Sequence, residues 1–397
     1  MLCTNKMLDK TTEIERTRTA RNEKLDLVRG VSALLVLIAH VRSLVLVDFV
    51  QIENASIFMK MGYFLTGIHH QAVIVFFILS GFFVGGSVLQ AVRRGRFSWK
   101  RYASARLTRL WIVLFPALVL TCVLDLWGQR LAPEVYAGEC YRAFQSGPSE
   151  SQPISLGLGT FLGNLVFLQT IVVRPYGTNG PLWSLANEFW YYVLFPLVVM
   201  SGSLCFGATR YRWYSVIGIV LSAALVWWLP PAILLPSPIW LFGVIVWIVS
   251  QNDAAMRVMQ HWSWNFCFGM LFLGSLASSK TSSLAGTDFV VGLSFACWVP
   301  SLLGPWARQG WCQWISLASS EISYTLYVTH FPLSFLLAAS WFRGRQSFPD
   351  VVGCSLFMAI VTSALAVAWM MWFLFESNTE RVRHLLEARS FSKQATT

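Results

Sequence analysis

Apolar stretches long enough to cross a lipid bilayer recur along this chain and limit what it can fold into. The first runs from about residue 27 to 48, and the last from about 352 to 376. A spanning helix needs about 20 such residues, and lipid excludes any segment whose backbone groups stay unpaired. We therefore expect an all-α fold, a polytopic bundle of transmembrane helices.

About ten spans can be counted by this criterion. They lie near residues 27–48, 69–91, 107–127, 183–203, 213–229, 234–250, 263–279, 287–304, 320–342 and 352–376. Composition agrees, because 55% of the 397 residues are hydrophobic and only 12% are charged. Soluble domains carry about twice that share of charged residues.

Basic residues beside the spans account for much of the net charge of +11. The densest group follows the second span and consists of Arg93, Arg94, Arg96, Lys100, Arg101, Arg106 and Arg109. Cytoplasmic segments of membrane proteins carry such an excess, so we place this group and both termini in the cytoplasm. Membrane topology explains the charge, and nucleic acid is not expected as a partner.

One membrane domain is expected over residues 25–380, between cytoplasmic tails at 1–24 and 381–397. Residues 128–182 hold no clear span, and we expect an extracytoplasmic loop there. Within it, residues 156–172 are apolar but contain three glycines and Asn164, which favours a loop helix or a re-entrant segment over a full crossing.

Arg29 and His40 lie eleven residues apart in the first span. At about 100° and 1.5 Å per residue they share one helix face, about 16 Å apart along the axis. His40 then lies near the bilayer midplane, where an ionisable side chain is costly and marks a working site. A neutral imidazole can take a proton from a hydroxyl and return it. The alternative is a histidine satisfied by a hydrogen bond between helices.

Arg106 and Arg109 lie three residues apart at the inner end of the third span. Such a pair can hold the phosphates of an anionic donor, although positive-inside charge explains it equally well. Asp26 precedes Arg29 by three residues and can hold that guanidinium.

Later spans supply further candidates. Glu188 lies inside a span, where a carboxylate needs a partner and can orient a histidine or bind a sugar hydroxyl. Trp183 either stacks on a sugar or belongs to an interfacial aromatic belt. Tyr324, Tyr327 and His330 share one side of a late span, as a substrate contact or a structural polar network. Without a His/Cys cluster in the sequence, no metal is expected.

Six short motifs occur in a fixed order along residues 22–380. They are Leu25-Asp26…Arg29-Gly30…His40, Phe76-Phe77…Ser80-Gly81-Phe82, Arg106…Arg109, Trp183-Ser184-Leu185…Glu188, Ser323-Tyr324…Tyr327…His330-Phe331-Pro332 and Phe375-Glu376. This ordered set resembles the acyltransferase-3 family of integral-membrane acyltransferases. After Glu376 the family often has a basic residue and then proline, whereas this chain has Ser377 and Asn378.

The resemblance implies an enzyme of the bacterial inner membrane. It would move an acyl group, usually acetyl, from cytoplasmic acetyl-CoA to a hydroxyl of a surface or exported carbohydrate. It implies essential roles for Arg29 and His40 and a functional pair in Arg106 and Arg109. We expect His40 to act as general base with Glu188 beside it, and the three arginines to bind the donor. The substrate would contact Trp183, Tyr324, Tyr327 and His330.

Two alternatives stay open at this point. A transient acetyl-histidine is one variant of the transfer. A carrier or flippase for a glycolipid would use a similar basic entrance and aromatic lining without covalent chemistry. Expected partners are the acyl-CoA donor, a carbohydrate or glycolipid acceptor and the lipid bilayer, and the oligomeric state is open.

Overall fold

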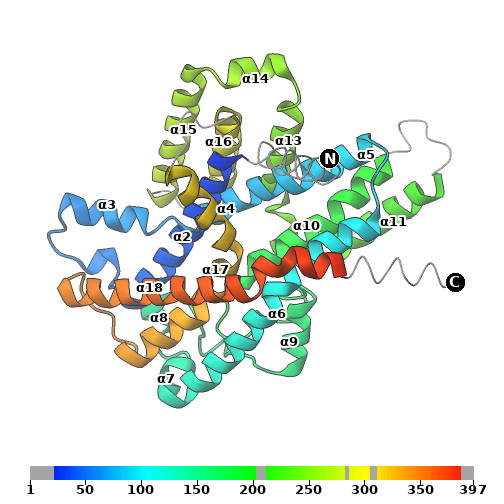
Figure 1. Ribbon diagram of the computed structural model, residues 1–397. Helices are drawn as coiled ribbons and strands as arrows, with labels where there is room; N and C mark the ends of the chain where they lie inside the picture. The colour runs from blue at the N-terminus through cyan, green and yellow to red at the C-terminus, as the bar shows by residue number, and fades with distance from the viewer. Residues whose placement is uncertain (1–21, 203–211, 282–285, 305–310, 386–397) are drawn as a thin grey trace, which may run out of the picture.

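The computed structural model describes residues 22–202, 212–281, 286–304 and 311–385, and within these ranges it is a bundle of α-helices (Figure 1). The expected all-α class is confirmed for this part of the chain. Most of the two expected tails lies outside the described residues.

Each expected span coincides with a helix or with two consecutive helices. The long elements are α2 (Glu23–Val45), α4 (His69–Ser80) with its continuation α5 (Gly86–Arg93), α6 (Trp99–Leu131), α10 (Leu182–Ser201), α11 (Arg212–Trp228), α12 (Pro231–Leu234) with α13 (Ser237–Val249), α15 (Trp262–Thr281), α16 (Thr287–Leu302), α17 (Trp311–Phe342) and α18 (Val351–Leu374). In the described chain, 6 helices are long and apolar enough to cross a membrane. The further crossings and the sides of the termini stay predictions.

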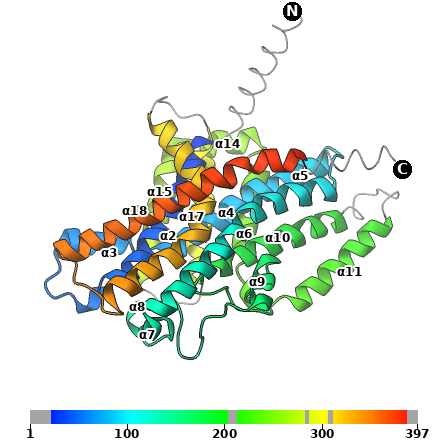
Figure 2. The ribbon, with the colours of Figure 1, turned by 60° about the horizontal axis from the view of Figure 1, so that its bottom comes forward.

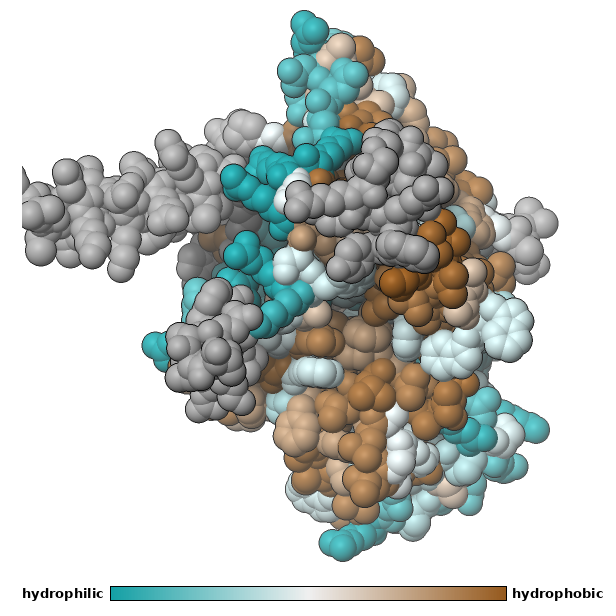
Figure 3. Space-filling view, turned by 90° about the vertical axis from the view of Figure 1, so that its right-hand side faces the viewer, coloured by the Kyte–Doolittle hydropathy of each residue, from teal (hydrophilic) through white to brown (hydrophobic). Residues whose placement is uncertain are grey.

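Apolar side chains cover a broad face of the molecule, while hydrophilic residues gather toward opposite ends of the view (Figure 3). Trp227 on α11 is 89% exposed and Phe266 on α15 is 63% exposed. Contiguous exposed apolar surface of this kind marks contact with lipid or protein. It agrees with a bundle whose outer side chains face the bilayer.

Close helix contacts hold the centre of the bundle. Helices α2 and α17 run side by side in both ribbon views (Figures 1 and 2). Gly30 of α2 allows this approach, because a Cβ there would overlap the Ser319 side chain. Small residues at such contacts are typical of membrane helix packing. The motif residues of α2 and α17 therefore lie on two helices whose backbones pack closely against each other.

The segment between α6 and α10 folds back onto the bundle. It contains only short helices, α7 (Pro133–Tyr136), α8 (Tyr141–Phe144) and α9 (Leu158–Leu165). Residues 156–172 thus hold an eight-residue helix and no full crossing, as expected. Buried Asp125 of α6 accepts hydrogen bonds from Thr178 N and Oγ1 over 2.7 and 2.8 Å. Asn179 Nδ2 donates to the Val328 carbonyl over 2.9 Å, so the end of the segment is tied to α6 and α17.

Candidate active site

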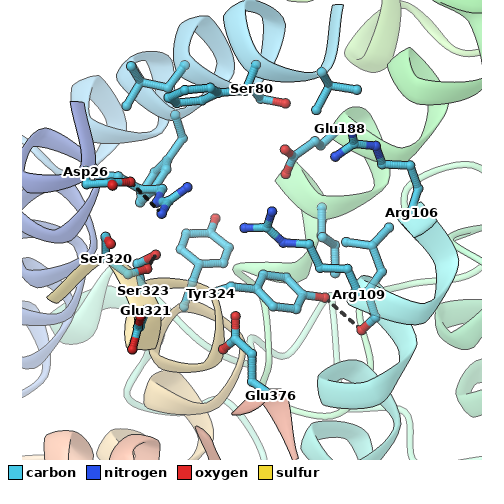
Figure 4. Close-up of a pocket in the computed structure, with 18 of the residues that line it drawn as sticks. Asp26, Ser80, Arg106, Arg109, Glu188, Ser320, Glu321, Ser323, Tyr324 and Glu376 are labelled. Atoms are coloured by element: carbon cyan, nitrogen blue, oxygen red, sulfur yellow. Dashed lines mark hydrogen bonds and ion pairs between the residues drawn. The ribbon is translucent and has the colours of Figure 1, made fainter. Parts of the chain in front are cut away.

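A cavity of about 810 Å³ lies between helices that are far apart in the chain. Its walls come from α2, α4, α6, α10, α17 and α18, and their side chains converge on one space (Figure 4). The ionisable residues of the wall other than tyrosine are Asp26, Arg29, Arg106, Arg109, Glu188, Glu321, Glu376 and Glu380. A concave space of this volume suits a small-molecule ligand.

Neighbouring side chains position two of the three arginines of the cavity. Arg29 Nη2 donates to Asp26 Oδ1 over 2.9 Å, which confirms the expected partner. Arg106 Nη2 donates to Ser87 Oγ over 3.1 Å, and its guanidinium lies 5.9 Å from the centre of the Tyr192 ring. In the described chain, buried Arg106 Nε has no hydrogen-bond partner. A guanidinium that is held in place with unused donors is suited to bind an anion.

Glu188 belongs to a directed chain of hydrogen bonds across three helices. Tyr192 donates to its carboxylate from one turn later on α10. Ser80 Oγ lies 3.1 Å from the Tyr192 hydroxyl and accepts from Trp240 Nε1 over 3.1 Å. Because Tyr192 donates to Glu188, Ser80 donates to Tyr192. A π-helical turn, Gly81–Gly85, follows Ser80 directly, and such turns are frequent at functional sites.

Glu376 enters the same cavity beyond the end of α18 (Figure 4). Its Oε2 accepts a hydrogen bond from Thr325 Oγ1 over 2.5 Å, and Arg109 and Arg29 lie within electrostatic range. Glu380 forms an ion pair of 2.6 Å with Arg383. These two carboxylates are therefore engaged by groups of the protein itself.

His40 and His330 form a pair between α2 and α17. His40 Nδ1 lies 2.9 Å from His330 Nε2. On the other side of the His330 ring, Nδ1 lies 3.0 Å from the Leu326 carbonyl oxygen and 2.9 Å from that of Tyr327. A carbonyl oxygen only accepts, so Nδ1 of His330 carries the proton and its Nε2 accepts from His40 Nδ1. A neutral His40 then has an unprotonated Nε2.

The histidine pair lies one turn beyond the cavity along α17. Tyr327 lines the cavity, and His330 follows three residues later. The Tyr327 hydroxyl lies 2.5 Å from Ser184 Oγ and donates to the Pro181 carbonyl over 3.0 Å. Phe76, also in the cavity wall, meets the Tyr327 ring edge-on at 6.0 Å between centroids. Tyr327 and Phe76 thus form the wall on the side of the histidines.

The structure brings most of the predicted residues to one place. Residues of the cavity wall are Arg29, Arg106, Arg109, Glu188, Tyr324 and Tyr327. His40 and His330 lie together behind that wall, and both nitrogens of His330 are engaged within the protein. Trp183 instead packs edge-on against Phe77, with 6.4 Å between ring centroids.

Several contacts of the site were not expected from the sequence. The His40–His330 bond and the place of Ser80 beside Tyr192 join residues more than a hundred positions apart. The bond from Tyr192 to Glu188 joins residues one turn apart on α10. In the sequence, Ser80 could have been singled out as a site residue because it belongs to the Ser80-Gly81-Phe82 motif. The adjacent His69 and His70 offered a second signal, since the His69 ring lies 5.2 Å from the His40 ring.

Fold and site together define a helical membrane protein whose arginine-lined cavity adjoins a histidine pair. A family model described as an acyltransferase domain matches residues 22–373, nearly the whole chain. The chain therefore belongs to the acyltransferase-3 family, as its ordered motifs predicted, and it is a membrane acyltransferase. Neither a curated protein nor a solved structure matches it.

Proposed function

We propose that this acyltransferase moves an acetyl group from cytoplasmic acetyl-CoA to a hydroxyl of a surface or exported carbohydrate, with His40 as general base. The observation that carries the proposal is the order of hydrogen bonds through the histidine pair. The backbone of α17 fixes the proton of His330, and His330 in turn holds Nδ1–H of His40. The remaining nitrogen, His40 Nε2, is the proton acceptor.

The donor would bind in the cavity, with its phosphates on Arg29, Arg106 and Arg109. Guanidinium groups bind phosphate through paired, charge-assisted hydrogen bonds. Arg29 and His40 lie about 16 Å apart along one helix. The pantetheine arm of the donor would cover this separation and present the thioester past Tyr327.

The chemical step balances without any further reactant. His40 Nε2 takes the proton of the acceptor hydroxyl while the oxygen attacks the thioester carbonyl. The tetrahedral intermediate then collapses, the carbon–sulfur bond breaks, and the imidazolium returns the proton to the departing thiolate. An ester and free CoA leave the site. In the two-step variant, His40 Nε2 attacks the thioester itself, the carbon–sulfur bond breaks and the CoA thiolate leaves. The acceptor hydroxyl then takes the acetyl group from Nε2, and its proton passes to the thiolate.

The other predicted residues take supporting roles in this proposal. His330 acts through His40 as a positioning residue. Glu188, which was expected beside His40, lies in the cavity wall and accepts a hydrogen bond from Tyr192. Together with Tyr324 of the same wall it would orient the arm of the donor. Trp183 lies next to Phe77 and stays a predicted sugar contact.

The test is acetyl transfer from radiolabelled acetyl-CoA to extracted surface glycan, in membranes with matched amounts of protein. His40→Ala should lower transfer about 10²–10⁴-fold, the range for a general base. His261→Ala is the matched control, because His261 is exposed and in the described chain its ring bonds to the nearby Ser263. Added imidazole should restore part of the activity of His40→Gly.

Two results would contradict the proposal. Near-normal transfer by His40→Ala would make His40 a structural histidine. If wild-type membranes put no label into any glycan fraction, a carrier without covalent chemistry becomes the better explanation. Label that stays on the protein after removal of the acceptor would select the acetyl-histidine variant.

A further inference from the structure

A second polar cluster lies at the end of the bundle opposite the arginine-lined cavity. It consists of Arg42 at the end of α2, His69 and His70 at the start of α4, Lys280 at the end of α15 and Asp288 at the start of α16. We call it the distal cluster. It adjoins the proposed base directly, since the His40 and His69 rings lie 5.2 Å apart.

Two cations of the distal cluster lack a direct ion pair in the described chain. The Arg42 guanidinium lies 5.1 Å from the centre of the Tyr63 ring, and its buried Nε has no hydrogen-bond partner there. Exposed Lys280 donates to the Gly67 carbonyl. Arg42 and Lys280 lie within electrostatic range of each other and of His69. Like charges gathered in this way favour an anion between them.

Two carboxylates lie near these cations, and in the described chain neither forms a direct ion pair with Arg42 or Lys280. Asp288 Oδ2 lies 2.8 Å from His70 Nε2. Asp48, which lies within electrostatic range of Arg42, accepts from Gln145 Nε2 over 3.0 Å. Buried His69 Nδ1 has no hydrogen-bond partner in the described chain, and a buried polar atom left without one is destabilising.

Membrane topology gives no other reason for this charge. The distal cluster lies at the end of the bundle that we expect to face outward. Positively charged residues are enriched on the cytoplasmic side, so Arg42 and Lys280 run against the general trend. Cations kept at such a place, beside the proposed base, point to a ligand.

We propose that the distal cluster binds an anionic group of the acyl acceptor, a carboxylate or a phosphate, so that the preferred acceptor is an acidic glycan. The inference rests on the proposed function. Arg42 and Lys280 would form charge-assisted hydrogen bonds to the acid group. A neighbouring hydroxyl of the same glycan would then reach His40 past His69.

The experiment uses the full chain in membranes and labelled acetyl-CoA. Glycan from the cells that carry this protein is divided by anion exchange into neutral and acidic fractions. The acidic fraction is also used after reduction of its carboxyl groups and, separately, after removal of its phosphates. The first treatment abolishes a carboxylate and the second a phosphate, so the two arms identify the source of the charge.

The variants are Arg42→Gln and Lys280→Gln, with Lys60→Gln on exposed α3 (Ile57–Leu65) as the matched control. Each site variant should raise KM for the acidic fraction by at least about tenfold, as expected for loss of a bond to a charged group. The KM for acetyl-CoA should stay unchanged. Arg42→Lys and Lys280→Arg, which keep the charge, should restore part of the affinity.

The outcomes separate this inference from the proposed function. Transfer that occurs equally well to neutral and acidic glycans, and equally well in the glutamine variants, would overturn the acidic-acceptor inference alone. An absence of labelled glycan in the wild type would overturn the proposed function as well. Loss of transfer after only one of the two treatments would support the inference and name the acid group.

Discussion

His40 Nδ1 on α2 lies 2.9 Å from His330 Nε2 on α17, and the opposite nitrogen of His330 faces two carbonyl oxygens of its own helix. A backbone group of one helix therefore decides which nitrogen of a histidine on another helix carries a proton. The contact requires α2 and α17 to lie close, and Gly30 permits this approach. Such a fixed tautomer leaves Nε2 of a neutral His40 unprotonated, as the proposed general base requires.

The first prediction concerns this pair. His330→Phe removes the acceptor for His40 Nδ1–H, and kcat of acetyl transfer should fall by at least about tenfold. The KM for acetyl-CoA should not change, because His330 lies outside the cavity wall. His330→Gln, whose carbonyl can accept the same bond, should retain more activity and a pH–rate profile closer to the wild type. Full activity in His330→Phe would show that His330 does not position His40 for the reaction.

The second prediction concerns the proposed donor site. Arg106→Ala should raise KM for acetyl-CoA about 10- to 100-fold, because hydrogen bonds to charged groups contribute about 1.5–3 kcal/mol. Arg106→Lys should have a KM for acetyl-CoA between those of the wild type and Arg106→Ala, because lysine keeps the charge but lacks the planar guanidinium that binds phosphate through two bonds. Arg101→Ala, an exposed position on the same helix, serves as control. A KM equal to that of the control would remove Arg106 from the donor site.

The third prediction concerns the bond from Tyr192 to Glu188. Tyr192→Phe leaves the carboxylate without its donor and should lower the free energy of unfolding by about 1–3 kcal/mol. The double variant Tyr192→Phe/Glu188→Gln should lose less unfolding free energy than the two single variants added together, because each single variant already removes the same interaction. Thermal unfolding of the purified protein in detergent measures this, with Tyr141→Phe at a 44% exposed position as control. Strict additivity would show that the two residues act independently.

The fourth prediction concerns the anchor of the 132–181 segment. Asp125→Ala leaves the backbone N–H and the hydroxyl of Thr178 without their acceptor in a buried site. The free energy of unfolding should therefore fall by about 2–4 kcal/mol. Limited proteolysis should then cut this segment faster, whereas Glu139→Ala at an exposed position should not change the rate. Equal rates in the two variants would mean that the segment is held mainly by other contacts.

Much of the architecture was predictable because it depends on local sequence. Apolar runs of about 20 residues predict helices wherever lipid leaves the backbone no other partner. The pairing of Asp26 with Arg29 follows from a spacing of three residues on one helix, and the structure confirms it. The ordered motifs likewise identified the family, which the match over residues 22–373 confirms.

The tertiary structure decided which distant residues meet. His40 and His330 are 290 positions apart, and Ser80 and Tyr192 are 112 apart. Helical periodicity gives the face on which each side chain lies, but not the rotation or depth of the helix that packs against it. The sequence by itself determined the helices, their membrane character and the family. Packing between helices determined the proton order in the histidine pair and the convergence of three arginines on one cavity, because both depend on contacts made only when the bundle closes.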